Sequence, residues 1–222
     1  GQKPTCLVIT DSDQAGVEDV KGQFDQILLD MKIAHRDVDL ALDGADAIPS
    51  LTSFDRVILL MPSLDGLSTH LSDIMSWVSA GGSLMLAMPP DNSSYLQVIA
   101  SKLGIESAGY DYVKAESIVP SEDFMLGGEE RYELSDPFDS SLSVSLRETA
   151  REWAKTGDAG APLIWSNDCG SGRTVVCNIG IYDKVMRGFY AAATSLLGDA
   201  TAYPVINLSL IHISEPTRQE AI

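Results

Sequence analysis

The chain has 222 residues, of which 32 are acidic and 15 are lysine or arginine, so its formal net charge at pH 7 is −17. Such an acidic surface repels phosphate backbones, which excludes nucleic acid as a partner. Hydrophobic residues make up 45% of the chain, which is typical of a packed globule, and no apolar run reaches the roughly eighteen residues that a membrane span needs.

The first half of the chain alternates between short apolar runs and amphipathic segments. We expect buried strands at residues 5–10, 34–40, 56–61 and 83–88. Apolar spacings of three and four predict helices at 17–33 and 67–80, and a third helix runs from Ser93 or Ser94 to 102. This order predicts an α/β fold with a doubly wound, mostly parallel sheet and helices on both faces.

The second half is less regular. Residues 105–158 show no clear period, and we interpret them as an irregular or inserted segment. Residues 109–113 and 116–119 could form short strands within it, and residues 147–155 one or two helical turns. Turn-forming residues at 167–172 separate two apolar runs, 162–165 and 173–179, which predicts a late β-hairpin. A last amphipathic helix follows at 183–197.

Ligands of open α/β sheets bind beyond the carboxyl ends of the strands, near the point where the strand order reverses. The residues that we expect to line such a cleft are Asp11, Ser12, Asp13, Ser63, Asp91, Tyr182 and Asp183. Carboxylates are good ligands for a hard cation, so Asp11 and Asp13 would also suit a divalent metal. The competing interpretation is that Ser12 or Asp13 caps the helix that follows.

The sequence lacks the motifs that usually carry catalysis or cofactor binding. It has no G-x-S-x-G turn or cysteine counterpart, and two acids follow the first strand where a dinucleotide-binding turn would hold pyrophosphate. His35 and His70 lie apart from any nucleophile, while Cys6 and Cys177 fall in apolar runs typical of buried thiols. We therefore assign no catalytic residue, cofactor or metal ligand.

Residues 65–88 resemble the class I glutamine amidotransferase-like superfamily, in which a helix ending in Gly-Gly leads into a core strand beside the active site. The matching stretch is Trp77-Val-Ser-Ala-Gly-Gly82 and the strand after it. The resemblance implies a flavodoxin-like architecture. It implies no amidotransferase activity, because the G-x-C-x-G cysteine and late His-x-Glu of those enzymes are missing here.

A closer resemblance relates most of residues 5–207 to a bacterial family known only as domain of unknown function 2194. The matching stretches are Met31-Lys-Ile-Ala-His-Arg-Asp-Val-Asp-Leu40, Pro162-Leu-Ile-Trp165, Gly172-Arg-Thr-Val-Val-Cys-Asn-Ile-Gly180, Arg187-Gly-Phe-Tyr-Ala-Ala-Ala193 and Tyr203-Pro-Val-Ile-Asn207. The resemblance implies an amidotransferase-like domain joined to a polysaccharide-deacetylase-like region. There, an Asp-Asp pair shortly after Asn207 would supply a metal ligand and a general base.

The last fifteen residues, 208–222, differ in character from the rest. Leu208-Ser-Leu-Ile-His-Ile-Ser-Glu-Pro-Thr-Arg218 back-translates into a transposase adapter used in short-read sequencing. We therefore expect a native domain over 1–207, truncated where the deacetylase-like region would begin, and a non-native tail. The chain also begins abruptly before its first strand, so its compartment stays open, with a secreted or cell-envelope protein as the expectation.

Together these observations predict a non-catalytic amidotransferase-like domain, part of a larger bacterial protein that acts on or binds polysaccharide. Its expected partners are the deacetylase-like region of the same protein and a carbohydrate. Two alternatives stay open at this point. One is a metal-dependent hydrolase that uses Asp11, Asp13 and Asp91, and the other is a plain protein-interaction module.

Overall fold

The computed structural model describes residues 3–125, 128–180 and 186–198. Its strands are β1 (Cys6–Thr10), β2 (His35–Asp39), β3 (Arg56–Leu60), β4 (Ser83–Leu86), β5 (Ile105–Pro120), β6 (Tyr132–Leu146), β7 (Ala150–Thr156), β8 (Pro162–Cys169) and β9 (Gly172–Cys177). Its α-helices are α1 (Val17–Asp30), α2 (Leu40–Asp43), α3 (His70–Ser79), α4 (Ser94–Ile99) and α5 (Arg187–Ser195). Short 3-10 helices cover Ala45–Ala47, Leu51–Ser53, Asp65–Leu67 and Ala100–Leu103.

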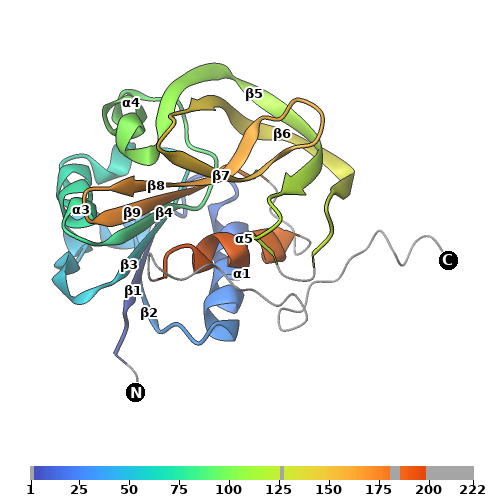
Figure 1. The fold of residues 1–222 in the computed structure, drawn as a ribbon. Helices are drawn as coiled ribbons and strands as arrows, with labels where there is room; N and C mark the ends of the chain where they lie inside the picture. Colours follow the sequence, from blue (N-terminus) through green and yellow to red (C-terminus); the bar gives the residue numbers. More distant parts are fainter. Residues whose placement is uncertain (1–2, 126–127, 181–185, 199–222) are drawn as a thin grey trace.

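All nine strands of the described residues join one mixed sheet in the order β2-β1-β3-β4-β9-β8-β7-β5-β6 (Figure 1). The strands from β2 to β9 in this order pair in parallel. Every pairing from β9 to β6 is antiparallel. The molecule is therefore an α/β fold whose sheet has a parallel half and an antiparallel half.

Side chains of the parallel half alternate between two hydrophobic clusters because neighbouring residues of a strand face opposite sides. In β1, for example, Cys6 and Val8 face the cluster that contains the buried sides of α1 and α5. Leu7 and Ile9 face the other cluster, which contains the buried sides of α3 and α4. Each face of this half is thus covered by helices. The inner strands β1, β3 and β4 are almost wholly apolar, as is typical of buried parallel strands, whereas the edge strand β2 is mostly polar.

The structure confirms the predicted strands of the first half and the late hairpin. Strand β8 pairs with β9 in antiparallel register, with Cys169 opposite Gly172 at the turn. Ser93 caps α4 as expected, because its Oγ accepts a hydrogen bond from the backbone N–H of Leu96 at 3.4 Å. No helix among the described residues is long and apolar enough to cross a membrane.

Three expectations are wrong. The sheet is not mostly parallel, since its antiparallel pairings equal its parallel ones in number. Residues 105–158 form the long strands β5 and β6 and the shorter β7 rather than irregular loops, and the possible short strands at 109–113 and 116–119 are parts of β5. The expected helical turns at 147–155 are largely strand β7. The full strands were hidden because half of the residues of β5 are exposed and its pairing with β6 shifts register at four places.

Strands β5 and β6 curl back over the rest of the sheet (Figure 1). Strand β6 is the last strand in the hydrogen-bonding order, yet it contacts β8 although β7 and β5 lie between them in that order. The curl brings Leu142, in the middle of β6, next to Asn178, which directly follows β9.

Asn178 joins the end of β9 to the edge strand β6 through its side-chain amide. Its Oδ1 accepts from the backbone N–H of Leu142 at 2.8 Å, and its Nδ2 donates to the carbonyl of the same residue at 2.9 Å. The Nδ2 also donates to the carbonyl of Pro162 at 3.1 Å, and the backbone carbonyl of Asn178 accepts from Ser141 Oγ at 2.5 Å. This fully buried side chain therefore pairs with backbone groups of the edge strand β6, as a further strand would.

The backbone after Asn178 passes so close to β6 that only glycine fits. A Cβ on Gly180 would lie 1.6 Å from Oγ of Ser140, whose hydroxyl donates to the carbonyl of Gly180 at 3.1 Å. The Asn-Ile-Gly stretch that contributes to the family resemblance thus has a packing role in the described fold.

We predict that Asn178→Ala lowers the free energy of unfolding by about 3 kcal/mol or more, because it leaves several buried polar groups without partners. Urea denaturation measures the change. Asn92→Ala is a matched control, since Asn92 Nδ2 also donates to two backbone carbonyls, of Ala108 and Gly109, but at a more exposed place. The control should cost about 1 kcal/mol. Equal losses in the two variants would contradict the role assigned to Asn178.

Candidate functional site

The expected cleft lies where the parallel strands end. Strand β1 lies between β2 and β3 in the sheet. The next strand along the chain, β2, is added on one side of β1, and β3 is added on the other side, so the strand order reverses at β1. A ligand crevice is expected at this point, between Asp11 after β1 and Ser63 after β3. In the structure, these two residues share hydrogen bonds with the side chain of Gln14.

The side chain of Gln14 closes this crevice. Its Nε2 donates to Asp11 Oδ2 at 3.1 Å and to the carbonyl of Ser63 at 3.0 Å, while its Oε1 accepts from the backbone N–H of Ser63 at 2.8 Å. Gln14 thus links the ends of β1 and β3 at the position where a ligand would be expected. Gln14 was missed in the sequence because a single glutamine in a turn belongs to no motif.

Ser12 and Asp13 do not cap the helix that follows, which corrects the competing interpretation of these residues. The N-cap of α1 is Gly16, in a left-handed conformation and without a side-chain hydrogen bond. The backbone N–H of Ser12 instead donates to Asp39 Oδ1 at 3.0 Å, and that of Asp13 donates to Asp11 Oδ1 at 3.3 Å. The side chain of Asp13 is exposed.

Asp39, at the end of β2, is a further acid at this edge that the sequence did not single out. Its Oδ1 accepts from the backbone N–H groups of Ser12 and Ala41. Burial alone would raise the pKa of Asp39, but these hydrogen bonds outweigh burial and lower that pKa. Asp39 therefore stays ionised and orders the turn after β1.

Asp91 lies at the same edge, because its backbone N–H donates to the carbonyl of Pro62 at 3.0 Å. Partial burial, and to a lesser extent the charge of Asp65, raise the pKa of the Asp91 carboxyl. Asp65 was missed in the sequence, because it follows its strand by several residues in a 3-10 turn. Tyr182 and Asp183, the remaining predicted members of the cleft, lie outside the described residues.

The carboxylates expected to hold a metal do not assemble among the described residues. The one described group whose potential ligand atoms lie within 4.8 Å of one another is Asp25, His35 and Asp37, near the opposite end of β2. Lys21 already bridges it, with Nζ 2.5 Å from Asp25 and 3.0 Å from Asp37. Burial alone would lower the pKa of Lys21, but these hydrogen bonds outweigh burial and raise that pKa. The Lys21 ammonium therefore supplies a positive charge to this acidic group.

The cysteines of the two core strands are poor nucleophiles. Burial raises the pKa of Cys6 and of Cys177 to about 12, so neither forms a thiolate at neutral pH. Cys169 is also buried, next to Ser79 Oγ at 3.8 Å. All three cysteines are free thiols in the described fold.

The sequence of this chain matches the model of one protein family, described as an uncharacterised protein conserved in bacteria (DUF2194), over residues 1–149 and 137–218. The second match thus includes part of the tail expected to be adapter-derived. That interpretation stays a prediction, which the codons of residues 208–222 would test. Among curated proteins, none matches the sequence.

Several solved structures share the fold at low sequence identity. The exo-beta-1,4-mannosidase Op5Man5 from Opitutaceae bacterium strain TAV5 has a TM-score of 0.57 at 16% identity, covering 85% of this chain and 35% of its own. The beta-galactosidase from Bacillus circulans sp. alkalophilus has a TM-score of 0.59 at 16% identity, covering 92% and 32%. The cytoplasmic protein STM3548 from Salmonella typhimurium has a TM-score of 0.61 at 14% identity, covering 86% and 96%.

These likenesses concern the fold alone. The chain spans about a third of the length of the two glycosidases but nearly the whole length of the Salmonella protein. The same arrangement of elements therefore occurs both as a part of a larger chain and as a chain of its own.

We predict that Gln14→Ala lowers the free energy of unfolding by about 1–3 kcal/mol, because the partly buried N–H of Ser63 loses its acceptor. Chemical denaturation measures the loss. Gln97→Ala, on the exposed side of α4, removes an amide whose one hydrogen bond is a long 3.5 Å contact and should change stability by less than about 0.5 kcal/mol. A Gln14 variant as stable as the Gln97 variant would contradict the closure of the crevice.

The raised pKa of Asp91 predicts a pH-dependent effect. The folded state holds this proton more tightly than the unfolded state, so ionisation of Asp91 removes stability as the pH rises through the raised pKa. Asp91→Asn should therefore be more stable than the parent at pH 7, and the difference should narrow as the pH falls toward 4. Urea midpoints across this range check it, with exposed Asp111→Asn as the control. A variant less stable than the parent at pH 7 would show that the Asp91 charge is favourable.

Proposed function

This chain belongs to DUF2194, a family of uncharacterised proteins conserved in bacteria, and from that membership we propose that it is a non-catalytic, amidotransferase-like domain of a larger protein that acts on or binds polysaccharide. In this proposal the sheet is a doubly wound, flavodoxin-like sheet extended by an antiparallel half. The domain binds carbohydrate or supports the catalytic region, and the chemistry lies elsewhere in the protein.

The observation that carries the non-catalytic part is the closed crevice. Gln14 uses all of its amide functions to join Asp11 to Ser63 at the point where ligands of this fold class bind. An amidotransferase needs a reactive thiolate, and the two strand cysteines have pKa values far above neutral. Both facts favour a domain that has the architecture of the superfamily without its reaction.

The carbohydrate part of the proposal rests on the solved structures that share the fold. Two of the structures with this fold are a mannosidase and a beta-galactosidase, and the chain covers about a third of each. A domain of this size recurring within larger carbohydrate-acting chains favours a role beside such activity. The deacetylase-like region after Asn207, with its Asp-Asp pair, and a location in the envelope or outside the cell are further parts of the same proposal.

The competing hydrolase function has no support from the described geometry. The two oxygens of Asp11 each accept a hydrogen bond within the protein, from Gln14 and from Asp13, and Asp91 forms no described ligand group with them.

A combined assay tests the proposal. We expect the chain to migrate more slowly in native gels that contain a soluble mannan or galactan, while releasing neither acetate nor reducing sugar from it. Calorimetric titration with Zn²⁺ or Mn²⁺ should show no tight binding that Asp11→Ala abolishes. Bovine serum albumin serves as the non-binding reference in the gels.

The alternative results are distinct. Tight metal binding lost in Asp11→Ala, together with metal-dependent release of acetate, would replace this proposal by the hydrolase. Unchanged migration in every polysaccharide gel would contradict carbohydrate binding by this domain and leave a protein-interaction module.

A further inference from the structure

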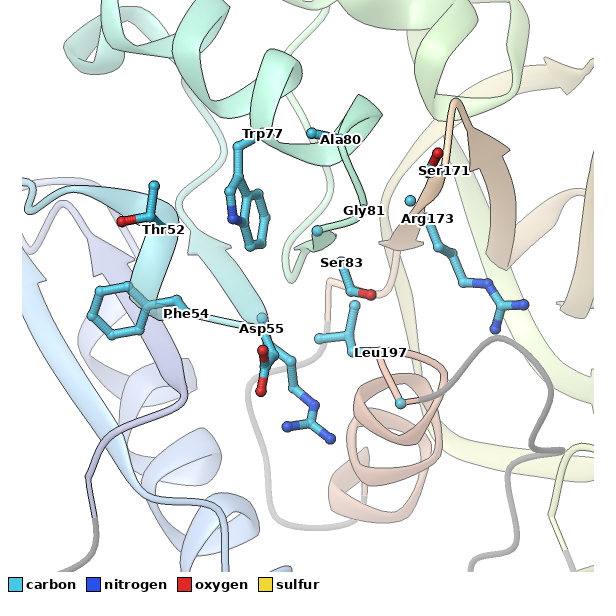
Figure 2. A pocket seen from close by; sticks show the side chains of 14 residues that line it. Thr52, Phe54, Asp55, Trp77, Ala80, Gly81, Ser83, Ser171, Arg173 and Leu197 are labelled. Carbon is cyan, nitrogen blue, oxygen red and sulfur yellow. The ribbon is translucent and has the colours of Figure 1, made fainter.

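A pocket of about 640 Å³ lies at the opposite edge of the sheet from the expected cleft. It is formed where β3, β4 and β9 begin, between the turn after α3, the β8–β9 turn and the end of α5 (Figure 2). Its volume falls in the range of small-molecule sites, roughly 300–1,000 Å³. Neither the fold class nor the proposed function assigns a role to this edge.

Glycines allow the pocket walls to come together. A Cβ on Gly82 would lie 2.4 Å from the ring of Trp77, so the indole lies directly against the backbone of the turn after α3. A Cβ on Gly172 would lie 2.0 Å from the carbonyl of Val78 and 2.2 Å from that of Gly82. The two glycine-containing turns therefore pack backbone to backbone, and the half-buried Trp77 forms a wall of the pocket (Figure 2).

Two arginines line the pocket, and they differ in their surroundings. Arg173 is fixed in place, because its Nη1 donates to the carbonyl of Leu196 at 3.2 Å and its Nε lies 3.7 Å from Asp168. Arg56 has a buried Nε without a hydrogen-bond partner, and it forms no ion pair with any residue in the described ranges. Its neighbour Asp55 lies at the pocket too, yet the two side chains do not pair.

The chain has 32 acidic residues and 15 basic ones, yet no acidic side chain of the described residues pairs with Arg56. Because Arg56 lines the pocket, an anionic ligand bound there can supply the missing counter-charge. The planar guanidinium suits a carboxylate or phosphate, to which it donates two parallel hydrogen bonds.

We propose that this pocket binds a small molecule that carries a carboxylate or phosphate group, with the anionic group paired with Arg56 and an apolar face packed against Trp77. The proposal does not depend on the carbohydrate binding proposed above. Large polyanions are excluded as ligands, because the net charge of −17 repels them before short-range contacts form.

The three tryptophans give a direct readout of binding. Trp153 and Trp165 are buried, and their indole N–H groups donate to Ser166 Oγ and to the carbonyl of Leu103. Trp77 is the one tryptophan that solvent reaches, so acrylamide quenching of tryptophan fluorescence reports on the pocket. The probes are D-glucuronate, inorganic phosphate, and D-glucose as the neutral match to glucuronate.

We expect at least one of the two anions to protect Trp77 from quenching in a saturable manner, whereas glucose does not at the same concentrations. A response to glucuronate alone identifies a carboxylate ligand, and a response to phosphate alone identifies a phosphorylated one. Arg56→Gln should weaken binding roughly tenfold or more, the usual effect of losing a hydrogen bond to a charged group. Arg36→Gln, an exposed change of equal charge on β2, should leave binding unchanged.

Melting curves show that the variants fold, and Arg56→Gln should melt no lower than the parent because it removes an unpaired buried group. Arg56→Lys, which keeps the charge but loses the planar fork, should bind with intermediate strength. The proposal is overturned if neither anion gives a saturable response, or if Arg36→Gln and Arg56→Gln weaken binding equally.

Discussion

The curl of the antiparallel half depends on the amide of Asn178. A sheet that ends in an antiparallel edge strand exposes a row of unpaired backbone groups, which favours aggregation. Here the edge strand β6 curls back, and the amide of Asn178 pairs with both backbone groups of Leu142 at the place where a further strand would pair. The curled edge is thereby fastened to the end of β9, the strand at which the parallel and antiparallel halves meet.

The same principle operates at the carboxyl edge of the parallel strands. There the amide of Gln14 takes up the polar groups of Asp11 and Ser63 that a ligand would otherwise meet. In both places a side-chain amide, which donates and accepts at once, replaces an external partner. At the position where ligands of open α/β sheets bind, Asp11 and Ser63 are thus bridged by a side chain of the protein itself. The arginine-lined pocket at the other edge keeps a polar group, Arg56 Nε, without a partner among the described residues.

The sequence was most informative where one physical signal dominated. Continuous apolar runs located strands such as residues 5–10 and 56–61, and turn formers between two such runs located the β8–β9 hairpin. Only two short pieces of strand β5, residues 109–113 and 116–119, could be predicted, because half of its residues are exposed and bulges interrupt its alternation. At the carboxyl edge, the positions after the strands pointed to Asp11 and Ser63. They did not point to Gln14 or Arg56, whose roles depend on which partners the fold brings near, and no local pattern encodes that.

Native-state hydrogen exchange of two backbone amides tests the account most directly. The N–H of Leu142 is bound by Asn178, and the N–H of Ser63 is bound by Gln14. If these contacts close the sheet and the crevice, both amides should exchange only through global unfolding, with protection that matches the free energy from denaturation. Exchange of either amide through local opening, at the rate of frayed edge residues, would contradict the account.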